Sequence, residues 1–429
     1  MKLFKKVITS VIVLLVCFLF AFGVWKWMNH KTTEILSHTQ TEKMQKELQE
    51  KKQESKSIVS DGDNAEQTKV VTPQAEVEKA EDEDEIPKII SRMTIKQKIA
   101  QMFMITPEQL TDYNKVTSAG EVTRKALEEY QVGGIILFAN NIETPEQLKE
   151  MTGNLQKYSK EICDIPLFLG IDEEGGSVAR IADNPQFDVP KFADMKTIGQ
   201  EGSQRAYEVG ASIGQYLKTF GFNLDFAPVA DVLTNPKNTV VQKRAFSNDA
   251  TVTSDMVLAE MKGLEENNIY ACLKHFPGHG GTSGDTHRGY SYTSKTMEEL
   301  KETELVPFQK GIEAGVSFIM MSHISVPNSV AGEEPASLSR YIQTQILRNE
   351  MKYDGIIITD AMNMGAITEQ YSSGEAAVKA IQAGTDIVLM PEDFKAAYQA
   401  VIQAVEDGVV TKERIDQSVE RILRRKMGE

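Results

Sequence analysis

The chain has 429 residues, of which 41% are hydrophobic and 25% charged, and its formal net charge is −15 at pH 7. This composition is typical of a globular protein and excludes collagen-like, disulfide-scaffold and wholly disordered chains. The acidic balance argues against nucleic acid as a partner, because a phosphate-binding face needs clustered lysine and arginine. The three cysteines, Cys17, Cys163 and Cys272, are too widely spaced to indicate a disulfide framework.

The first 30 residues predict a membrane anchor. Nineteen residues from Val7 to Trp25 carry no charge, which is close to the ~20 that a helix needs to cross a ~30 Å hydrocarbon core. The lysines before this stretch favour a cytoplasmic N-terminus. We therefore expect a single-pass protein of the cell membrane whose remaining residues lie on the extracytoplasmic side. The alternative is a cleaved signal peptide and a secreted chain.

Residues 31–86 predict a flexible stalk. They contain 15 acidic and 8 basic residues and no aromatic residue. Such a segment cannot bury enough apolar surface to offset the chain entropy lost on folding. The acidic run from Glu81 to Glu85 has neither the alternating ligands nor the turn glycine of a calcium loop, so we interpret it as a solvated charge run.

Residues 87–429 predict one barrel domain in which short apolar runs alternate with amphipathic segments. This alternation is typical of an α/β fold with a parallel sheet, and eight repeats fit a (β/α)8 TIM-type barrel. A doubly wound nucleotide-binding sheet would need a glycine-rich loop after its first strand, which the sequence does not have. The expected strands are Gln101–Ile105, Gly133–Phe138, Pro166–Ile171, Phe222–Pro228, Tyr270–His275, Ser317–His323, Gly355–Thr359 and Asp386–Met390. The expected helices include Pro145–Tyr158, Gln204–Thr219, Ser254–Glu266, Met297–Ala314 and Glu375–Ala383.

Polar residues stand where several of these strands end. Because the carboxyl ends of barrel strands face one pocket, their side chains should converge there. Any one of them alone could be a structural group, and for Asp225, Asp231 and the Ser322–His323 pair we keep that interpretation. Asp360 follows the apolar run 355–359 and is a candidate nucleophile for attack on a sugar. A cap for the next helix is its alternative role.

The segment from Lys274 to His287 predicts a loop that carries acid/base chemistry. Four glycines and Pro277 exclude a helix. Asp285 and His287 are two residues apart, so an extended backbone would place both side chains on one face. A carboxylate beside an imidazole raises the pKa of the imidazole, which suits proton transfer near neutral pH.

A zinc site is the rival interpretation of the histidines in this segment. Its ligands would be His275, His279 and His287. Pro277 interrupts the first two, so their spacing is not the helical spacing of zinc enzymes. We therefore predict no metal.

These motifs together resemble glycoside hydrolase family 3, in particular its β-N-acetylglucosaminidase branch. The resemblance spans about residues 88–429 and is carried by Lys-His-Phe-Pro-Gly-His-Gly at 274–280 and Asp-Thr-His at 285–287. It implies a (β/α)8 barrel without metal or other cofactor. It also implies retaining hydrolysis of terminal β-linked N-acetylglucosamine through a covalent glycosyl-enzyme. A carbohydrate substrate derived from peptidoglycan suits a membrane-anchored, monomeric catalytic domain on a stalk.

The resemblance also assigns roles to individual residues. Asp360 matches the family nucleophile, His287 its acid/base histidine and Asp285 the partner of that histidine. The contacts to sugar hydroxyls and the acetamido group match Asp172, Arg180, Arg244, Lys274 and His275. Structural ion pairs are the alternative for Arg180 and Arg244.

Two other functions stay open at this stage. One is a phosphorylase with the same fold and nucleophile, because a neutral histidine repels inorganic phosphate less than a carboxylate does. The other is a tethered, non-catalytic wall-binding module, against which the complete set of proton-handling residues counts.

Overall fold

The structure is a computed structural model that describes residues 84–286 and 289–428. The predicted membrane anchor, the predicted stalk as far as residue 83 and the candidate acid/base His287 lie outside these residues. Within the described part of the chain, no helix is both long and apolar enough to cross a membrane.

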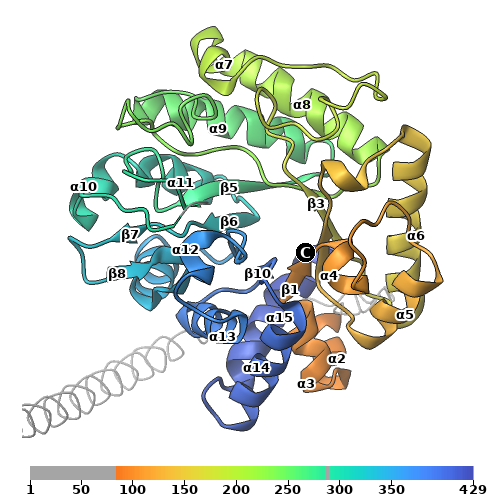
Figure 1. The fold of residues 1–429 in the computed structure, drawn as a ribbon. Helices are drawn as coiled ribbons and strands as arrows, with labels where there is room; N and C mark the ends of the chain where they lie inside the picture. Colours follow the sequence, from red (N-terminus) through yellow and green to blue (C-terminus); the bar gives the residue numbers. More distant parts are fainter. Residues whose placement is uncertain (1–83, 287–288, 429) are drawn as a thin grey trace, which may run out of the picture. The chain divides into compact units, whose positions relative to one another are not determined.

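Eight parallel strands form a nearly closed barrel (Figure 1). Each strand overlaps one of the eight predicted runs, and the order in the sheet is β10-β1-β2-β3-β4-β5-β6-β9. A parallel bridge between Ile358 and Ile387 joins the last strand to the segment that leads into the first of this order. The strands are β1 (Phe103–Ile105), β2 (Gly134–Ile136), β3 (Phe168–Ile171), β4 (Leu224–Asp225), β5 (Tyr270–Phe276), β6 (Phe318–Met321), β9 (Ile356–Thr359) and β10 (Val388–Leu389).

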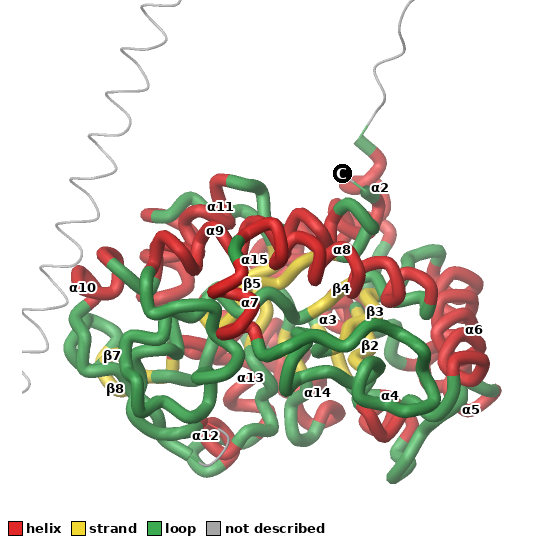
Figure 2. The backbone as a smooth tube through the Cα atoms, turned by 90° about the horizontal axis from the view of Figure 1, so that it is seen from above, coloured by secondary structure: helices red, strands yellow, loops and turns green. Residues whose placement is uncertain are grey.

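Helices surround the barrel (Figure 2), and their starts follow capping rules. Thr144 accepts a hydrogen bond from the Gln147 amide at the start of α6, and Pro145 occupies the first turn. The longer helices are α2 (Glu85–Arg92), α5 (Glu121–Glu129), α6 (Pro145–Cys163), α8 (Ser203–Thr219), α9 (Ala250–Glu265), α11 (Leu305–Glu313), α13 (Ser373–Ala383), α14 (Phe394–Glu406) and α15 (Lys412–Met427), together with the π-helix Tyr341–Glu350. The shorter ones are α3 (Ile95–Gln101), α4 (Pro107–Thr111), α7 (Met195–Glu201), α10 (Met297–Glu302) and α12 (Gly365–Thr368). A separate hairpin pairs β7 (Ser325–Val326) with β8 (Gly332–Pro335).

One helix prediction was wrong in its extent. The stretch Met297–Ala314 forms two helices, α10 and α11, that are separated at Thr303 and Glu304. Pro307 lies in the first turn of α11, where its missing N–H is harmless, but its ring would clash with the carbonyl of Thr303 in a continuous helix. The proline is therefore the sequence signal for the break.

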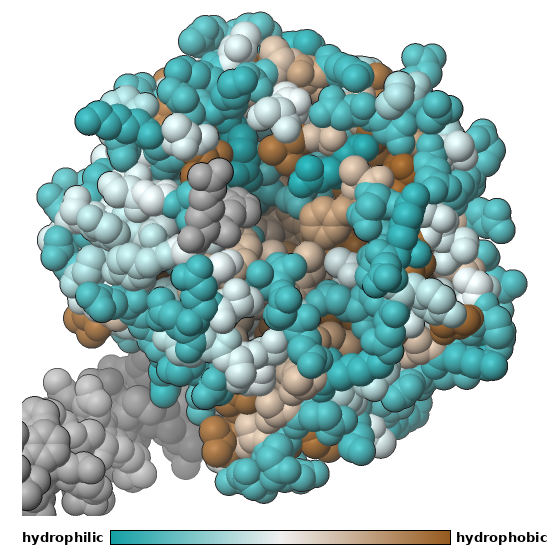
Figure 3. All heavy atoms as spheres, viewed as in Figure 1, coloured by the Kyte–Doolittle hydropathy of each residue, from teal (hydrophilic) through white to brown (hydrophobic). Residues whose placement is uncertain are grey.

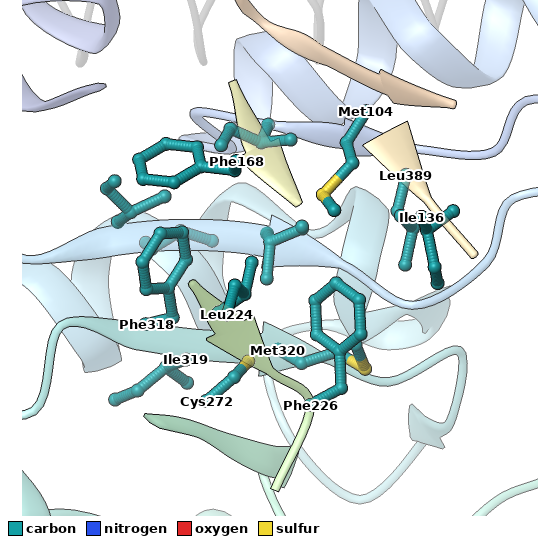
Figure 4. Close-up of a cluster of buried hydrophobic side chains, with 14 of the residues drawn as sticks. Met104, Ile136, Phe168, Leu224, Phe226, Cys272, Phe318, Ile319, Met320 and Leu389 are labelled. Carbon is teal, nitrogen blue, oxygen red and sulfur yellow. The ribbon is translucent and has the colours of Figure 1, made fainter. Parts of the chain in front are cut away.

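Close-packed apolar side chains fill the barrel interior (Figure 4). The rings of Phe168 and Phe318 meet edge to face, with centroids 5.1 Å apart. A Cβ at Gly170 would lie 2.5 Å from Met104 and 3.1 Å from Phe226, so only glycine leaves room for both side chains. Full burial of such side chains stabilises the fold by roughly 1.5–3 kcal/mol each, and this packed interior supports the floor of the cavity above it.

Candidate active site

A cavity of about 560 Å³ opens at the carboxyl ends of the strands. Figure 3 shows this face hollowed near its centre. Seven of the eight predicted site residues line the cavity, and the eighth, His287, lies outside the described residues. The seven are Asp172, Arg180, Arg244, Lys274, His275, Asp285 and Asp360. A larger cavity of about 860 Å³, lined by residues of α2 and α6 among others, contains none of them, so size alone does not identify the site.

Hydrogen bonds with the backbone hold Asp360 in place at the end of β9. Its amide donates to the Met321 carbonyl at 2.8 Å, and its Oδ1 accepts from the Ala361 amide at 2.8 Å. The next helix, α12, is capped by Met364, so the alternative role of Asp360 as a helix cap was wrong. Burial alone would raise the pKa of Asp360, but the imidazoles of His323 and His275 outweigh burial and lower it. The group is therefore a fixed carboxylate at neutral pH.

A buried ion network forms one wall of the cavity. Lys274 Nζ donates to Asp172 Oδ1 at 2.7 Å and pairs with Glu174 Oε1 at 2.6 Å. Arg244 donates two hydrogen bonds to the same Glu174 carboxylate, from Nε at 2.7 Å and from Nη2 at 2.6 Å. Burial would raise the pKa of Glu174, but the charges of Arg244 and Lys274 hold it well below its usual range. Such a bidentate, fully paired carboxylate fixes both cations in place.

His275 continues this network toward Asp231. The two side chains meet at 2.7 Å between Nδ1 and Oδ2, and Asp231 is fully buried. The Asp231 carboxylate also accepts from the backbone amide of His279 at 2.6 Å. The other ring nitrogen, Nε2, lies 3.3 Å from Arg244 Nη2, so His275 links Asp231 to the Arg244 end of the network.

Arg180 projects into the cavity from a loop that Glu173 positions. The buried Glu173 carboxylate accepts from the amides of Ile181 and Ala182, each at 2.9 Å, and also from the amide of Arg180. The Arg180 guanidinium lies 5.7 Å above the Phe138 ring. Its buried Nε has no hydrogen-bond partner among the described residues. Arg180 also lines the cavity, and its Nη2 lies 3.9 Å from Asp172 Oδ2.

Asp285 lies on a loop whose ends are paired. Ser283 and Tyr292 form an antiparallel bridge, with N···O distances of 3.0 and 3.3 Å. Asp285 is two residues inside this bridge and lines the cavity. The predicted shared face of Asp285 and His287 involves residue 287 and so stays a prediction.

The histidines of the rival zinc site differ in their placement. His279 is 1% exposed, and its Nδ1 lies 2.9 Å from the Thr282 hydroxyl. His279 is not among the residues that line the cavity, whereas His275 is. Among residues 84–286 and 289–428, no three histidine, cysteine or acidic side chains are grouped as metal ligands would be.

Sequence reasoning gave no role to Glu174 and kept Asp231 as a structural residue. The structure places Glu174 at the centre of the ion network and Asp231 behind His275. Both residues come just after predicted strands, and this position was the sequence signal that they lie near the cavity. Their partners are distant in sequence, on β5 and on the loop before α9, so no local pattern indicated the pairing.

A parallel barrel with a fixed carboxylate and paired charged side chains in the cavity at its carboxyl face has the architecture of a barrel enzyme, and a carboxylate so placed suits glycoside hydrolysis. Residues 94–425 match the family described as "Glycosyl hydrolase family 3 N terminal domain". The chain belongs to glycosyl hydrolase family 3.

Named relatives and solved structures agree with this family. The chain is 35% identical over 325 residues to Beta-hexosaminidase A of Pseudoalteromonas piscicida, covering 70% of this chain and 54% of that protein. It is 29% identical over 348 residues to Beta-hexosaminidase LpqI of Mycobacterium tuberculosis, covering 79% and 83%. A glycoside hydrolase family 3 β-N-acetylglucosaminidase structure from Paenibacillus sp. superposes with a TM-score of 0.73 at 35% identity, covering 78% of this chain and 63% of that one. The chain thus spans about half the length of the first relative and less than two thirds of the solved chain.

Proposed function

We propose that the protein is a β-N-acetylhexosaminidase that hydrolyses terminal β-linked N-acetylglucosamine with retention of configuration. The observation that carries this proposal is the single cavity shared by Asp360, the Lys274–Asp172 pair and Asp285. The names of the hexosaminidase relatives support the same activity.

The proposed reaction has two displacement steps. In the first, the Asp360 carboxylate attacks the anomeric carbon while His287, held protonated by Asp285, donates a proton to the leaving oxygen. In the second, neutral His287 takes a proton from water, and the hydroxide formed releases the sugar from Asp360. The lowered pKa of Asp360 keeps the nucleophile ionised for the first step.

The ion network binds the sugar in this proposal. Asp172 and Lys274 take ring hydroxyls, and the Arg180 guanidinium, which lines the same cavity, donates to a further oxygen. A substrate that lacks one of these hydroxyls leaves a buried group unpaired, which costs binding energy in the transition state. Arg244 and His275 complete the wall of the pocket and contact the acetamido side.

We also propose that the substrate is a peptidoglycan-derived glycan and that residues 1–30 anchor the chain to the outer face of the cell membrane. The charge-free run of residues 7–25 supports the anchor. Membrane fractionation of cells that express the full chain tests the anchor, and protease added to intact cells tests the side on which residues 87–429 lie.

The activity itself is tested with an aryl β-N-acetylglucosaminide and the full chain. The expected result is release of N-acetylglucosamine whose first-formed anomer is β, as seen by proton NMR. The same assay with inorganic phosphate should give no sugar phosphate by mass spectrometry. An α first product, a sugar phosphate product or no turnover would contradict the proposal. Asp407→Asn, an exposed change at the end of α14, is the matched control for substitutions in the cavity.

A further inference from the structure

Two exposed tyrosines follow the loop that carries Asp285. Along residues 290–293, exposure alternates: Tyr290 is 45% and Tyr292 40% exposed, whereas Ser291 and Thr293 are buried. An extended backbone places every second side chain on one face, so both rings leave the same face of this segment. The rings are stacked, with centroids 5.7 Å apart and planes 25° from parallel. They therefore present one aromatic surface to solvent.

The backbone beneath this surface is fixed to the barrel. Ser291 accepts a hydrogen bond from the amide of Ser325, on β7, at 2.9 Å, and Thr293 donates to the Ser325 carbonyl at 3.1 Å. Tyr292 itself pairs with Ser283 across the base of the loop. Two stacked, solvent-facing rings on a tethered backbone are preorganised for a ligand, because little side-chain freedom remains to be lost on binding.

The surface lies next to the cavity but outside it. Asp285 lines the cavity, whereas neither tyrosine does. Ser283 is opposite Tyr292, and Asp285 is two residues further on, a span of at most ~7 Å along the backbone. A pyranose ring bound beyond the cavity on this side can therefore reach both the Asp285 loop and the aromatic surface.

The chemistry of the proposed reaction fixes which sugar ring this is. An acid catalyst must come within hydrogen-bonding reach of the glycosidic oxygen. If the acid stands on the loop of Asp285, the ring that leaves with this oxygen lies on the outer side of that loop. The axial C–H groups of a β-linked pyranose make one of its faces apolar, and tyrosine offers a large apolar face with a polar edge.

We propose that Tyr290 and Tyr292 form an aglycone subsite that stacks on the sugar leaving the cavity, so that the substrate class is an oligosaccharide rather than a simple glycoside. This inference rests on the proposed function. The tyrosine rings touch the leaving sugar both before and during bond cleavage. They therefore stabilise the bound substrate and the transition state alike, and their loss should act mainly on KM.

The test compares two substrates of the full chain. N,N′,N″-Triacetylchitotriose carries sugars beyond the cleaved bond, whereas N-acetylglucosaminyl fluoride has no ring there. In the Tyr290→Ala/Tyr292→Ala double variant, the ratio of kcat/KM for chitotriose to kcat/KM for the fluoride should fall about tenfold or more, at about three- to tenfold per ring. The Tyr290→Phe/Tyr292→Phe variant keeps both rings and should retain most of the ratio.

A ratio that stays within twofold of wild type in the alanine variant would overturn the inference, as would an equal loss in the phenylalanine variant. These outcomes leave the proposed function intact if the wild-type chain still hydrolyses both substrates. A wild-type chain that turns over neither substrate overturns the proposed function itself, and the subsite with it.

Discussion

The two sides of the cavity are built differently. On the side of β3 and β5, hydrogen bonds and ion pairs of 2.6–2.7 Å join the buried Lys274 and Glu174 to the half-buried Asp172 and Arg244. On the other side, Asp285 stands on a loop that is paired to the barrel at its base and carries exposed tyrosines. In the proposed function, the first side holds the sugar in one pose, and the second side is where the leaving group is exchanged for water. Substitutions on the two sides should therefore have different signatures.

Removing the nucleophile should have the largest effect. Asp360→Asn keeps the shape of the side chain but removes the negative charge that, in the proposed mechanism, attacks the sugar. We expect kcat/KM to fall by about 10³-fold or more on every substrate, activated or not. Steady-state kinetics on the aryl glycoside and on chitotriose measure this loss. Asp407→Asn should behave like wild type. If the Asp360→Asn variant kept its turnover, Asp360 would not be the nucleophile.

Breaking the buried network should lower both activity and stability. Glu174→Gln leaves Arg244 without its carboxylate partner and leaves Lys274 paired with Asp172 alone. Loss of one partner from a buried pair costs about 3–5 kcal/mol, so we expect a lower Tm and a kcat/KM reduced by roughly 100-fold. Thermal unfolding followed by circular dichroism and kinetics on one preparation measure both quantities. A loss of activity without any fall in Tm would mean that Glu174 contacts the substrate and does not mainly stabilise the ion network of the cavity wall.

The loop side should show a dependence on the leaving group. His287→Ala should lower kcat/KM by about 10²–10⁴-fold on chitotriose, the range for general acid–base catalysis. On the aryl glycoside the loss should be smaller, since an activated leaving group needs little protonation, and the second step should then limit the rate. Equal losses on both substrates, or near wild-type turnover, would contradict the role proposed for His287.

The smallest effect on activity is expected at Glu260, on α9. The side chain is 1% exposed, and neither of its carboxylate oxygens has a hydrogen-bond partner among the described residues. Burial raises the pKa of Glu260 from 4.5 to about 8. Between these values the folded state keeps a proton that the unfolded chain releases, so the free energy of unfolding falls as pH rises, by up to ~1.4 kcal/mol per pH unit.

Glu260→Gln should remove that slope and leave the protein more stable than wild type at pH 8. The exposed Glu302→Gln serves as the control. Urea unfolding at pH 5, 6.5 and 8 measures the slope. Parallel pH profiles for wild type and Glu260→Gln would show that Glu260 does not titrate in this window.

The sequence predicted the features that depend on local pattern. All eight strands appeared as short apolar runs, and the residues at their carboxyl ends, such as Asp172, Lys274 and Asp360, reached one cavity. The pairing of Glu174 with Arg244 could not be predicted, because it joins segments 70 residues apart whose approach depends on barrel closure. Asp231 was seen at the rim, but its bond to His275 required the register between the ends of β4 and β5. The break before α11 was predictable from Pro307 and was missed.

The most direct measurement of the central claim is covalent trapping of the glycosyl-enzyme. A slow fluorinated N-acetylglucosaminyl fluoride is incubated with the full chain, and the labelled peptide is identified by mass spectrometry after proteolysis. The account predicts one sugar per chain on Asp360 and no label in Asp360→Asn. A label on another carboxylate, or hydrolysis of this reagent with no covalent species, would contradict it.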